Sequence, residues 1–141
     1  MTLVGLDRYF SFAEMIEIPA LWQKLVPHLG TTPSRVEPVD YGVCHDMGSE
    51  GFRYLAGFEV SEVPSLPADF STFNLPAQRY AVFEHEGDLS VLCDTIDSIW
   101  KAWLPASGEQ AAEPPLMFER YGPAFDPQAR KGDIQVWLAL K

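Results

Sequence analysis

An internal repeat constrains the fold of this chain more than any other feature of its sequence. The stretch ALWQKLVPHLG (Ala20–Gly30) aligns without a gap on SIWKAWLPASG (Ser98–Gly108), so that Trp, Pro and Gly recur at the same spacing. Similar strand-like stretches, RYFSF and RYAVF, precede the two copies, and a Tyr-Gly pair follows each copy. Such self-similarity indicates two copies of one supersecondary unit that pack together.

Each copy has the pattern strand, helix, strand, strand. In the first copy we predict strands at Leu3–Phe12, Val39–His45 and Phe52–Val60, and a helix that starts between Met15 and Pro19 and ends near Pro27. In the second copy we predict strands at Gln78–His85, Leu116–Tyr121 and Ile134–Leu140, a helix at about Leu89–Leu104, and a short strand, DFSTF, before Pro76.

The chain of 141 residues is expected to form one domain, 1–141. Repeat one covers about 1–62, repeat two covers about 69–141, and a Pro-containing connector, Ser61–Ala68, joins them. Because each repeat leaves one sheet face and one helix stripe uncovered, the two should join in a single α+β fold. We expect one antiparallel sheet with pseudo-twofold symmetry and a ligand groove between the halves.

Charge and motif content exclude several classes of function. The chain has 10 Lys and Arg, 20 Asp and Glu, and a net charge of −10, so it lacks the basic cluster that direct nucleic-acid binding requires. Its two cysteines fit no zinc-site spacing, and the N-terminal residues do not resemble a signal peptide. No apolar run is long enough to span a membrane. We expect a cytoplasmic protein without metal or cofactor.

The stretch PLMFERYGPAFDP contains the most informative polar residue, Glu119. Side chains alternate along a strand, so Met117, Glu119 and Tyr121 share one face while Phe118 and Arg120 share the other. A carboxylate among aromatic side chains and a methionine is costly to bury unless a partner compensates its charge. Glu119 is therefore a candidate for a functional residue.

The repeat provides a further argument for Glu119. When the Tyr-Gly pairs at Tyr41 and Tyr121 are aligned, Val39 stands opposite Glu119. Matched residues favour a shared structural role, whereas an unmatched acid requires another explanation. The alternative is a surface acid that pairs with Arg120 or Arg53.

Two other groups of chemically reactive residue types have simpler structural explanations. His85 and Glu86 lie in FEHEGD, where alternation separates neighbours and the turn chemistry of Gly87 and Asp88 accounts for the sequence without a metal. The adjacent residues of CHD, which begins at Cys44, would point to opposite faces of a strand and could not act together as nucleophile and base.

Five segments in order, IPALWQKLVPHLG, YGVC, LPAQRYAVFEHEG, IWKAWLPASG and FERYGPAFDP, resemble the GyrI-like small-molecule-binding family, also called the AraC-type effector-binding domain. The resemblance extends from Leu3 to the C-terminus. It implies a twofold strand-helix-strand-strand repeat and a pocket glutamate in the penultimate strand that faces hydrophobic, often cationic ligands among aromatic side chains. Glu119 occupies that place in FERY.

The resemblance also implies a range of activities. Family members often form the effector domain of multidrug-responsive transcription regulators, while others stand alone, including a gyrase-inhibitory protein and hydrolases of cyclopropane-containing genotoxins. No helix-turn-helix precedes the first strand, so this chain is not expected to bind DNA unless it is a domain of a longer regulator.

We predict a ligand-binding set drawn from both halves, and no catalytic residue outside it. The set comprises Glu119, Tyr41, Tyr121, Trp103 and Trp137. Trp22 and Trp100, which the repeat matches to each other, are predicted to serve the core.

Three functional hypotheses follow. The first is binding of a small hydrophobic molecule, cationic or aromatic, with Glu119 as the charged contact and ring faces adding cation–π attraction. The second is a hydrolase in which Glu119 acts as general base, assisted by Tyr41 or Tyr121. The third is binding to a protein such as gyrase through the acidic surface. The sequence leaves open the ligand, a homodimer and a separate DNA-binding domain.

Overall fold

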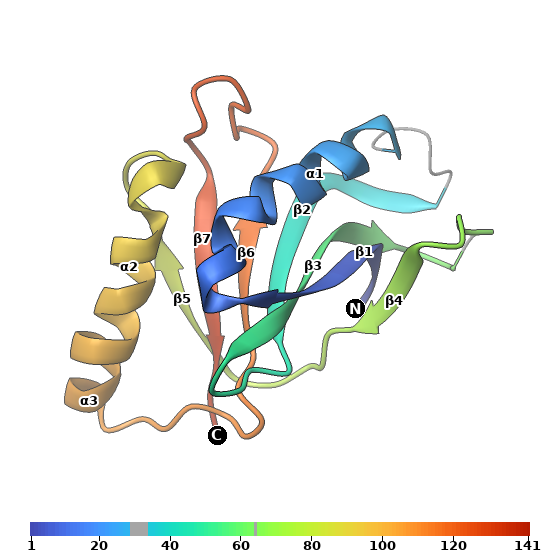
Figure 1. Cartoon of the computed structure of the whole chain (residues 1–141). Helices are drawn as coiled ribbons and strands as arrows, with labels where there is room; N and C mark the ends of the chain where they lie inside the picture. Colours follow the sequence, from blue (N-terminus) through green and yellow to red (C-terminus); the bar gives the residue numbers. More distant parts are fainter. Residues whose placement is uncertain (29–33, 64) are drawn as a thin grey trace.

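The computed structural model describes residues 1–28, 34–63 and 65–141, which form one antiparallel sheet with helices packed against it (Figure 1). The strands are β1 (Thr2–Ser11), β2 (Arg35–His45), β3 (Gly51–Val60), β4 (Phe70–Asn74), β5 (Tyr80–Glu84), β6 (Met117–Tyr121) and β7 (Ile134–Ala139). The helices are α1 (Ile18–Leu25), α2 (Leu92–Ser98) and α3 (Leu104–Ser107).

The predicted α+β architecture is confirmed, and the differences concern the ends of elements and the regularity of the second helical segment. β2 begins at Arg35 rather than Val39. The second helical segment is less regular than predicted, because a 3₁₀ turn precedes α2 and a π-helical turn, Ile99–Trp103, separates α2 from α3. Pro105, which has no backbone N–H, follows this turn closely and interrupts the regular hydrogen-bond ladder. Gly30 and Pro64 lie outside the described residues.

The sheet order reveals the twofold repeat. The seven strands are ordered β4-β1-β3-β2-β6-β7-β5. The first repeat contributes β1, β3 and β2, the second contributes β5, β7 and β6, and the two halves meet where β2 pairs antiparallel with β6. The short predicted strand DFSTF becomes β4, which extends the sheet beyond β1.

The register between β2 and β6 corrects the alignment of the two Tyr-Gly pairs. Gly42 pairs with Glu119, and Tyr41 pairs with Arg120. Tyr41 consequently belongs to one face of the sheet and Tyr121 to the other. Val39 lies on the face opposite Glu119, so it is not the structural counterpart of that acid. A one-residue offset in a strand alignment exchanges the faces of every side chain, which is why the sequence match was misleading.

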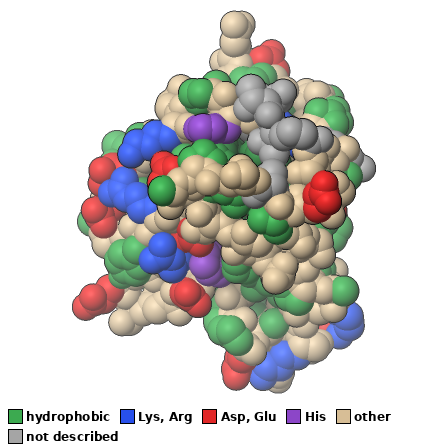
Figure 2. All heavy atoms as spheres, turned by 90° about the vertical axis from the view of Figure 1, so that its right-hand side faces the viewer, with side chains coloured by type: hydrophobic (Ala, Val, Ile, Leu, Met, Phe, Trp, Pro, Cys, Tyr) green, Lys and Arg blue, Asp and Glu red, His purple; other side chains and the backbone are tan. Residues whose placement is uncertain are grey.

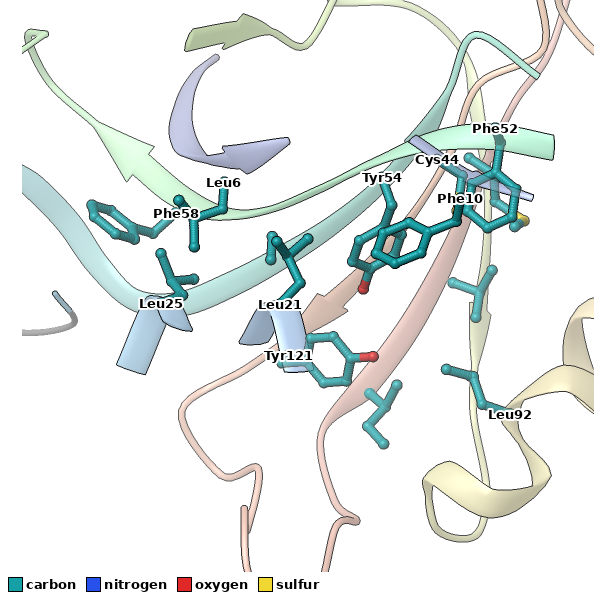
Figure 3. Close-up of a cluster of buried hydrophobic side chains, with 14 of the residues drawn as sticks. Leu6, Phe10, Leu21, Leu25, Cys44, Phe52, Tyr54, Phe58, Leu92 and Tyr121 are labelled. Atoms are coloured by element: carbon teal, nitrogen blue, oxygen red, sulfur yellow. The ribbon is translucent and has the colours of Figure 1, made fainter. Parts of the chain in front are cut away.

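The two faces of the sheet bury different sets of side chains. On the helix-covered face, Leu21, Leu25 and Leu92, from α1 and α2, belong to one buried cluster with Phe10 and Phe58 (Figure 3). On the opposite face, here called the outer face, a second cluster contains Leu3, Val39, Tyr41, Val43, Leu55, Leu75, Leu116, Phe118 and Ala139. Full burial of one such Leu or Phe side chain contributes about 1.5–3 kcal/mol, so both faces stabilise the fold.

The molecular surface at the edge formed by β4 and the end of α1 mixes both charges. Figure 2 shows basic side chains lying beside acidic ones there, with hydrophobic side chains scattered between them. Among the described residues, no helix has the length and apolarity needed to cross a membrane.

Candidate functional site

Glu119 lies near the centre of the sheet, on the face that the helices cover. Its side chain is 7% exposed, and its strand neighbour on β2 is Gly42. A Cβ atom at position 42 would lie 2.0 Å from the Tyr54 hydroxyl oxygen and 3.0 Å from Oε1 of Glu119. Glycine at this position therefore leaves the space in which the hydroxyl of Tyr54 reaches the carboxylate.

A short chain of hydrogen bonds holds the Glu119 carboxylate. The Tyr121 hydroxyl donates to Oε1 at 2.6 Å, and the Tyr54 hydroxyl donates to the same oxygen at 3.0 Å. The indole Nε1 of Trp22 donates to the Tyr54 hydroxyl at 3.1 Å. Figure 3 shows the hydroxyl groups of Tyr54, on β3, and Tyr121, on β6, turned toward the same region. From the part of the chain that the structure describes, both hydrogen bonds to Glu119 reach Oε1, and none reaches Oε2.

Neither of the arginines considered as surface partners neutralises Glu119. Arg53 contacts Asp7, with Nε 2.8 Å from Oδ1. Arg120 follows Glu119 in the same strand and therefore points to the outer face, where it lines a cavity. The interpretation of Glu119 as a surface acid paired with arginine is wrong.

Burial sets the protonation chemistry of this cluster. It raises the pKa of Glu119 above its ordinary value, although the hydrogen bonds from Tyr121 and Tyr54 and the nearby His85 oppose the rise. Burial and the charge of Glu119 raise the pKa values of Tyr54 and Tyr121 well above the ordinary value, so both hydroxyls remain donors at neutral pH.

Aromatic rings pack against the two tyrosines that hold the carboxylate on the helix-covered face. The ring of Trp22 meets that of Tyr121 edge to face, with centroids 5.7 Å apart, and that of Tyr54 at 6.4 Å. Phe125 packs against Tyr121 at 5.0 Å. The site thus combines one buried acid with an aromatic wall supplied by α1, β3, β6 and the loop after β6.

The structure does not bring the five predicted site residues together. Glu119 and Tyr121 are in direct contact, but Tyr41 and Trp137 lie on the outer face. Trp103 lies on the helix side, where its ring packs against Phe83 with centroids 4.9 Å apart. The expectation of one shared groove is therefore corrected, because the sheet separates Tyr41 and Trp137 from the acid.

Two neighbours of Glu119 were missed or assigned elsewhere. Tyr54 was not among the predicted site residues, and Trp22 was assigned to the core. Trp22 does pack against the core, and it also positions the Tyr54 hydroxyl. The alternation in GFRYLAGFEV could have indicated Tyr54, since Phe52, Tyr54 and Phe58 share the helix-covered face.

The other polar clusters are structural links. His85 is buried, with Nδ1 2.7 Å from the Thr95 hydroxyl and Nε2 2.8 Å from the Asp88 carbonyl, and it thereby ties the end of β5 to α2. Cys44 and His45 point to opposite faces of β2, as expected for neighbours in a strand: Cys44 faces the helices, and His45 contacts Asp7 on the outer face. Burial raises the pKa of the Cys44 thiol well above its ordinary value, which opposes a role as nucleophile. Within the described ranges, no group of three or more His, Cys, Asp and Glu side chains could hold a metal ion.

Comparison with protein families matches nearly the whole chain. Residues 1–140 match the family Cass2, described as integron-associated effector binding protein. The chain belongs to this family, and its fold is GyrI-like. The resemblance inferred from the five sequence segments is confirmed.

Curated relatives of this Cass2-family chain include transcriptional regulators. It is 34% identical over 136 residues to the "Probable transcriptional regulator YgiV" of Escherichia coli O157:H7, covering 93% of this chain and 80% of that protein. It is 33% identical over 127 residues to "Transcriptional regulator BrlR" of Pseudomonas aeruginosa, covering 88% of this chain. The match spans only 46% of the Pseudomonas protein, which is therefore about twice as long.

Solved structures share the fold at low sequence identity. The structure of SAV2435 bound to tetraphenylphosphonium superimposes with a TM-score of 0.79 at 16% identity, covering 100% of this chain and 88% of that one. An integron cassette protein from the mobile metagenome of Vibrio cholerae superimposes with a TM-score of 0.70 at 18% identity, covering 100% of this chain and 90% of that one.

Proposed function

We propose that this protein binds hydrophobic cations on the helix-covered face of its sheet, with Glu119 as the charged contact. The proposal rests on the buried carboxylate of Glu119, which is 7% exposed and accepts hydrogen bonds from two tyrosine hydroxyls. Arg53 contacts Asp7 instead, and Arg120 lies on the outer face. A buried acid without a compensating cation costs stability, and a bound cation would repay that cost.

The geometry of the carboxylate supports a cationic ligand. The tyrosine hydroxyls occupy Oε1, so Oε2 is available to face a ligand charge. Both hydroxyls stabilise the ionised form of Glu119 against the effect of burial on its pKa. A bound cation would act in the same sense as the two hydroxyls and favour the charged form of Glu119.

The aromatic wall supports a hydrophobic ligand. The ring of Trp22 contacts those of Tyr54 and Tyr121, the two residues that donate to the acid, and Phe125 contacts Tyr121. A cation over the face of such a ring gains roughly 0.5–2 kcal/mol. The structure of SAV2435, which has the same fold, contains the hydrophobic cation tetraphenylphosphonium, so this class of ligand is the first to test.

Calorimetric titration with two ions of the same shape tests the proposal. We expect tetraphenylphosphonium to bind and tetraphenylborate, its anionic counterpart, to bind at least about tenfold more weakly at this site. In Glu119→Gln, phosphonium affinity should fall by at least about tenfold, because the variant keeps the shape of the side chain and removes its charge. Glu62→Gln, which removes an exposed acid from the connector, is the matched control and should bind like the parent. Equal phosphonium affinities of the parent and Glu119→Gln would refute the role of this acid.

A hydrolase is the second candidate, and one observation favours it. The raised pKa of Glu119 suits a general base that activates water. However, Tyr54 and Tyr121 both donate to Glu119 itself, which leaves their hydroxyls engaged rather than directed at a substrate. Incubation with a cyclopropane-containing alkylating agent, followed by mass spectrometry, distinguishes the two functions. Product formed by the parent and lost in Glu119→Gln would establish catalysis.

The biological setting that we infer is effector recognition for transcription. Relatives named as transcriptional regulators support it, and the longer Pseudomonas regulator leaves room for a partner domain. In that setting this chain would report the ligand, and DNA contact would belong to another segment or protein.

A further inference from the structure

A cavity of about 450 Å³ opens on the outer face of the sheet, away from Glu119. It is lined by Met1, Tyr41, Leu75, Pro76, Ala77, Gln78, Tyr80, Phe118, Arg120 and Trp137. These residues come from β2, β5, β6 and β7, from the segment that joins β4 to β5, and from Met1 before β1. A volume of this size lies within the range typical of small-molecule sites.

Three aromatic rings form one wall of the cavity. Phe118 stacks on Trp137, with centroids 5.2 Å apart and planes inclined by 21°. Tyr80 meets Phe118 and Trp137 edge to face, at 5.4 Å and 5.6 Å. Mutual ring contacts of this kind restrict the motion of each ring, so the wall is formed before any ligand arrives.

Hydrogen bonds at the edges of the wall fix its orientation. The Tyr80 hydroxyl donates to the Pro76 carbonyl at 2.7 Å. The indole Nε1 of Trp137 donates to Oε1 of Gln135 at 3.0 Å, and Nε2 of Gln135 donates to Glu84 at 2.6 Å. The polar atoms of the two large rings are thus satisfied by the protein, and a ligand would meet their apolar parts.

Arg120 brings a positive charge into this aromatic surface. Arg35, Arg53 and Arg79 each contact a carboxylate within 3.0 Å. Across residues 1–28, 34–63 and 65–141, Arg120 has no such ion pair, and its strand neighbours Tyr41 and Gln135 are uncharged. Arg120 is a half-buried residue that lines the same cavity as the aromatic wall, and its guanidinium has the character of an anion-binding group.

We propose that the outer-face cavity is a second ligand site, which binds small flat aromatic carboxylates through Arg120. The guanidinium presents two parallel N–H donors that match a carboxylate, and the wall of Tyr80, Phe118 and Trp137 contacts the ring system of the ligand. The negative charges elsewhere on the protein oppose an anion only weakly, because salt screens charges over about 8 Å at physiological ionic strength.

The two proposed sites prefer ligands of opposite charge because neighbouring residues of β6 point to opposite faces of the sheet. Glu119 and Arg120 are consecutive in β6, and alternation directs the acid to the helix-covered face and the base to the outer face. Removal of either charge should therefore affect one ligand class and spare the other. This inference does not depend on whether hydrophobic cations bind at Glu119.

Titration with 2-naphthoate and its neutral counterpart 2-naphthamide tests the second site. We expect the carboxylate to bind at least about tenfold more tightly than the amide, and Arg120→Gln to remove this preference. Arg120→Lys should restore part of it, because the charge returns without the paired donors. Lys24→Gln, which removes one exposed positive charge from α1 on the other side of the sheet, is the matched control and should retain the parent's preference.

The position of the bound anion requires a second measurement. In a ¹H–¹⁵N spectrum of the parent, 2-naphthoate should shift the indole signal of Trp137, assigned with Trp137→Phe, and leave that of Trp22 in place. Glu119→Gln should bind 2-naphthoate as the parent does. Absence of 2-naphthoate binding in the parent, unchanged preference in Arg120→Gln, or a shift of Trp22 in place of Trp137 would each overturn the proposal, whatever the result with tetraphenylphosphonium.

Discussion

Two acids on opposite faces of the same sheet differ in how the protein treats their charge. Glu119, on the helix-covered face, is 7% exposed and accepts hydrogen bonds only from neutral hydroxyls among the described residues. Asp7, on the outer face, has a side chain that is 10% exposed and contacts two basic side chains. Asp7 has basic partners, whereas the described hydrogen-bond partners of Glu119 are neutral and its burial is deeper.

The pKa values of the two acids shift in opposite directions. Burial by itself would raise the pKa of Asp7, but the hydrogen bonds and charges of His45 and Arg53 outweigh it, and the pKa is lowered. The contacts are close, because His45 Nε2 lies 2.8 Å from Oδ2 and Arg53 Nε lies 2.8 Å from Oδ1. For Glu119 burial prevails, and the pKa is raised.

This contrast separates a structural acid from one that a ligand could complete. The charge of Asp7 is compensated within the fold and holds β1, β2 and β3 together. The charge of Glu119 receives no comparable compensation from the residues that the structure describes, so it favours folding less than a neutral side chain of the same shape would. Residues that cost stability in this way are typical of functional sites.

We expect the largest change in stability from substitution of Asp7, the acid whose charge is compensated within the fold. Asp7→Asn should lower the free energy of unfolding at neutral pH by about 2 kcal/mol, because it breaks charge-assisted hydrogen bonds and leaves Arg53 unpaired. The lowered pKa means that Asp7 stabilises the fold above the ordinary value of 3.8 and loses this contribution as pH falls through the folded value. Urea unfolding at several pH values should show the two proteins converging in acid.

Asp46→Asn is the matched control for Asp7→Asn. Asp46 also contacts His45, but at 3.7 Å, and its side chain is 73% exposed. The change in the free energy of unfolding should stay within about 0.5 kcal/mol. Equal losses in the two variants would mean that burial and pairing do not distinguish these acids.

Substitution of Glu119 should change the free energy of unfolding in the opposite direction. Glu119→Gln should raise the free energy of unfolding at pH 7 by about 1 kcal/mol, since the amide oxygen still accepts from Tyr54 and Tyr121 and no charge is buried. The folded pKa of Glu119 is raised, so its charge destabilises the fold progressively as pH rises from the ordinary value of 4.5 through the folded value. The gain should therefore disappear at low pH. A loss of stability at pH 7 would place Glu119 in the same class as Asp7.

The smallest effect tests the hydroxyl groups that hold Glu119. Tyr121→Phe removes the 2.6 Å hydrogen bond, so the pKa of Glu119 should rise further and cation binding should be lost at a higher pH than in the parent. At fixed neutral pH the change in binding free energy should stay below about 1 kcal/mol. Titrations with tetraphenylphosphonium across a pH series measure both quantities.

Two further tyrosine variants serve as comparisons for the shift in the pH midpoint of tetraphenylphosphonium binding. Tyr54→Phe should move the binding midpoint in the same direction but less, because its hydrogen bond to Oε1 is longer, at 3.0 Å. Tyr80→Phe, on the outer face, should leave the midpoint unchanged. A shift in Tyr80→Phe alone would contradict the separation of the two faces.

The sequence by itself determined the elements, the repeat and the opposite directions of Glu119 and Arg120. The helix and strand periods are local properties, so they can be read from a few neighbouring residues. The same local rule correctly separated Cys44 from His45. The family resemblance, which rests on five segments in order, also required no coordinates.

Tertiary structure alone decided which residues from other strands join Glu119. Alternation fixes faces within one strand, but the face of a distant strand depends on its pairing register, and a shift of one residue reverses it. That is why Tyr41 and Trp137 lie with Arg120, whereas Tyr54 reaches Glu119 over Gly42. The register depends on the packing of the entire sheet, so these groups of residues come together only when the chain folds.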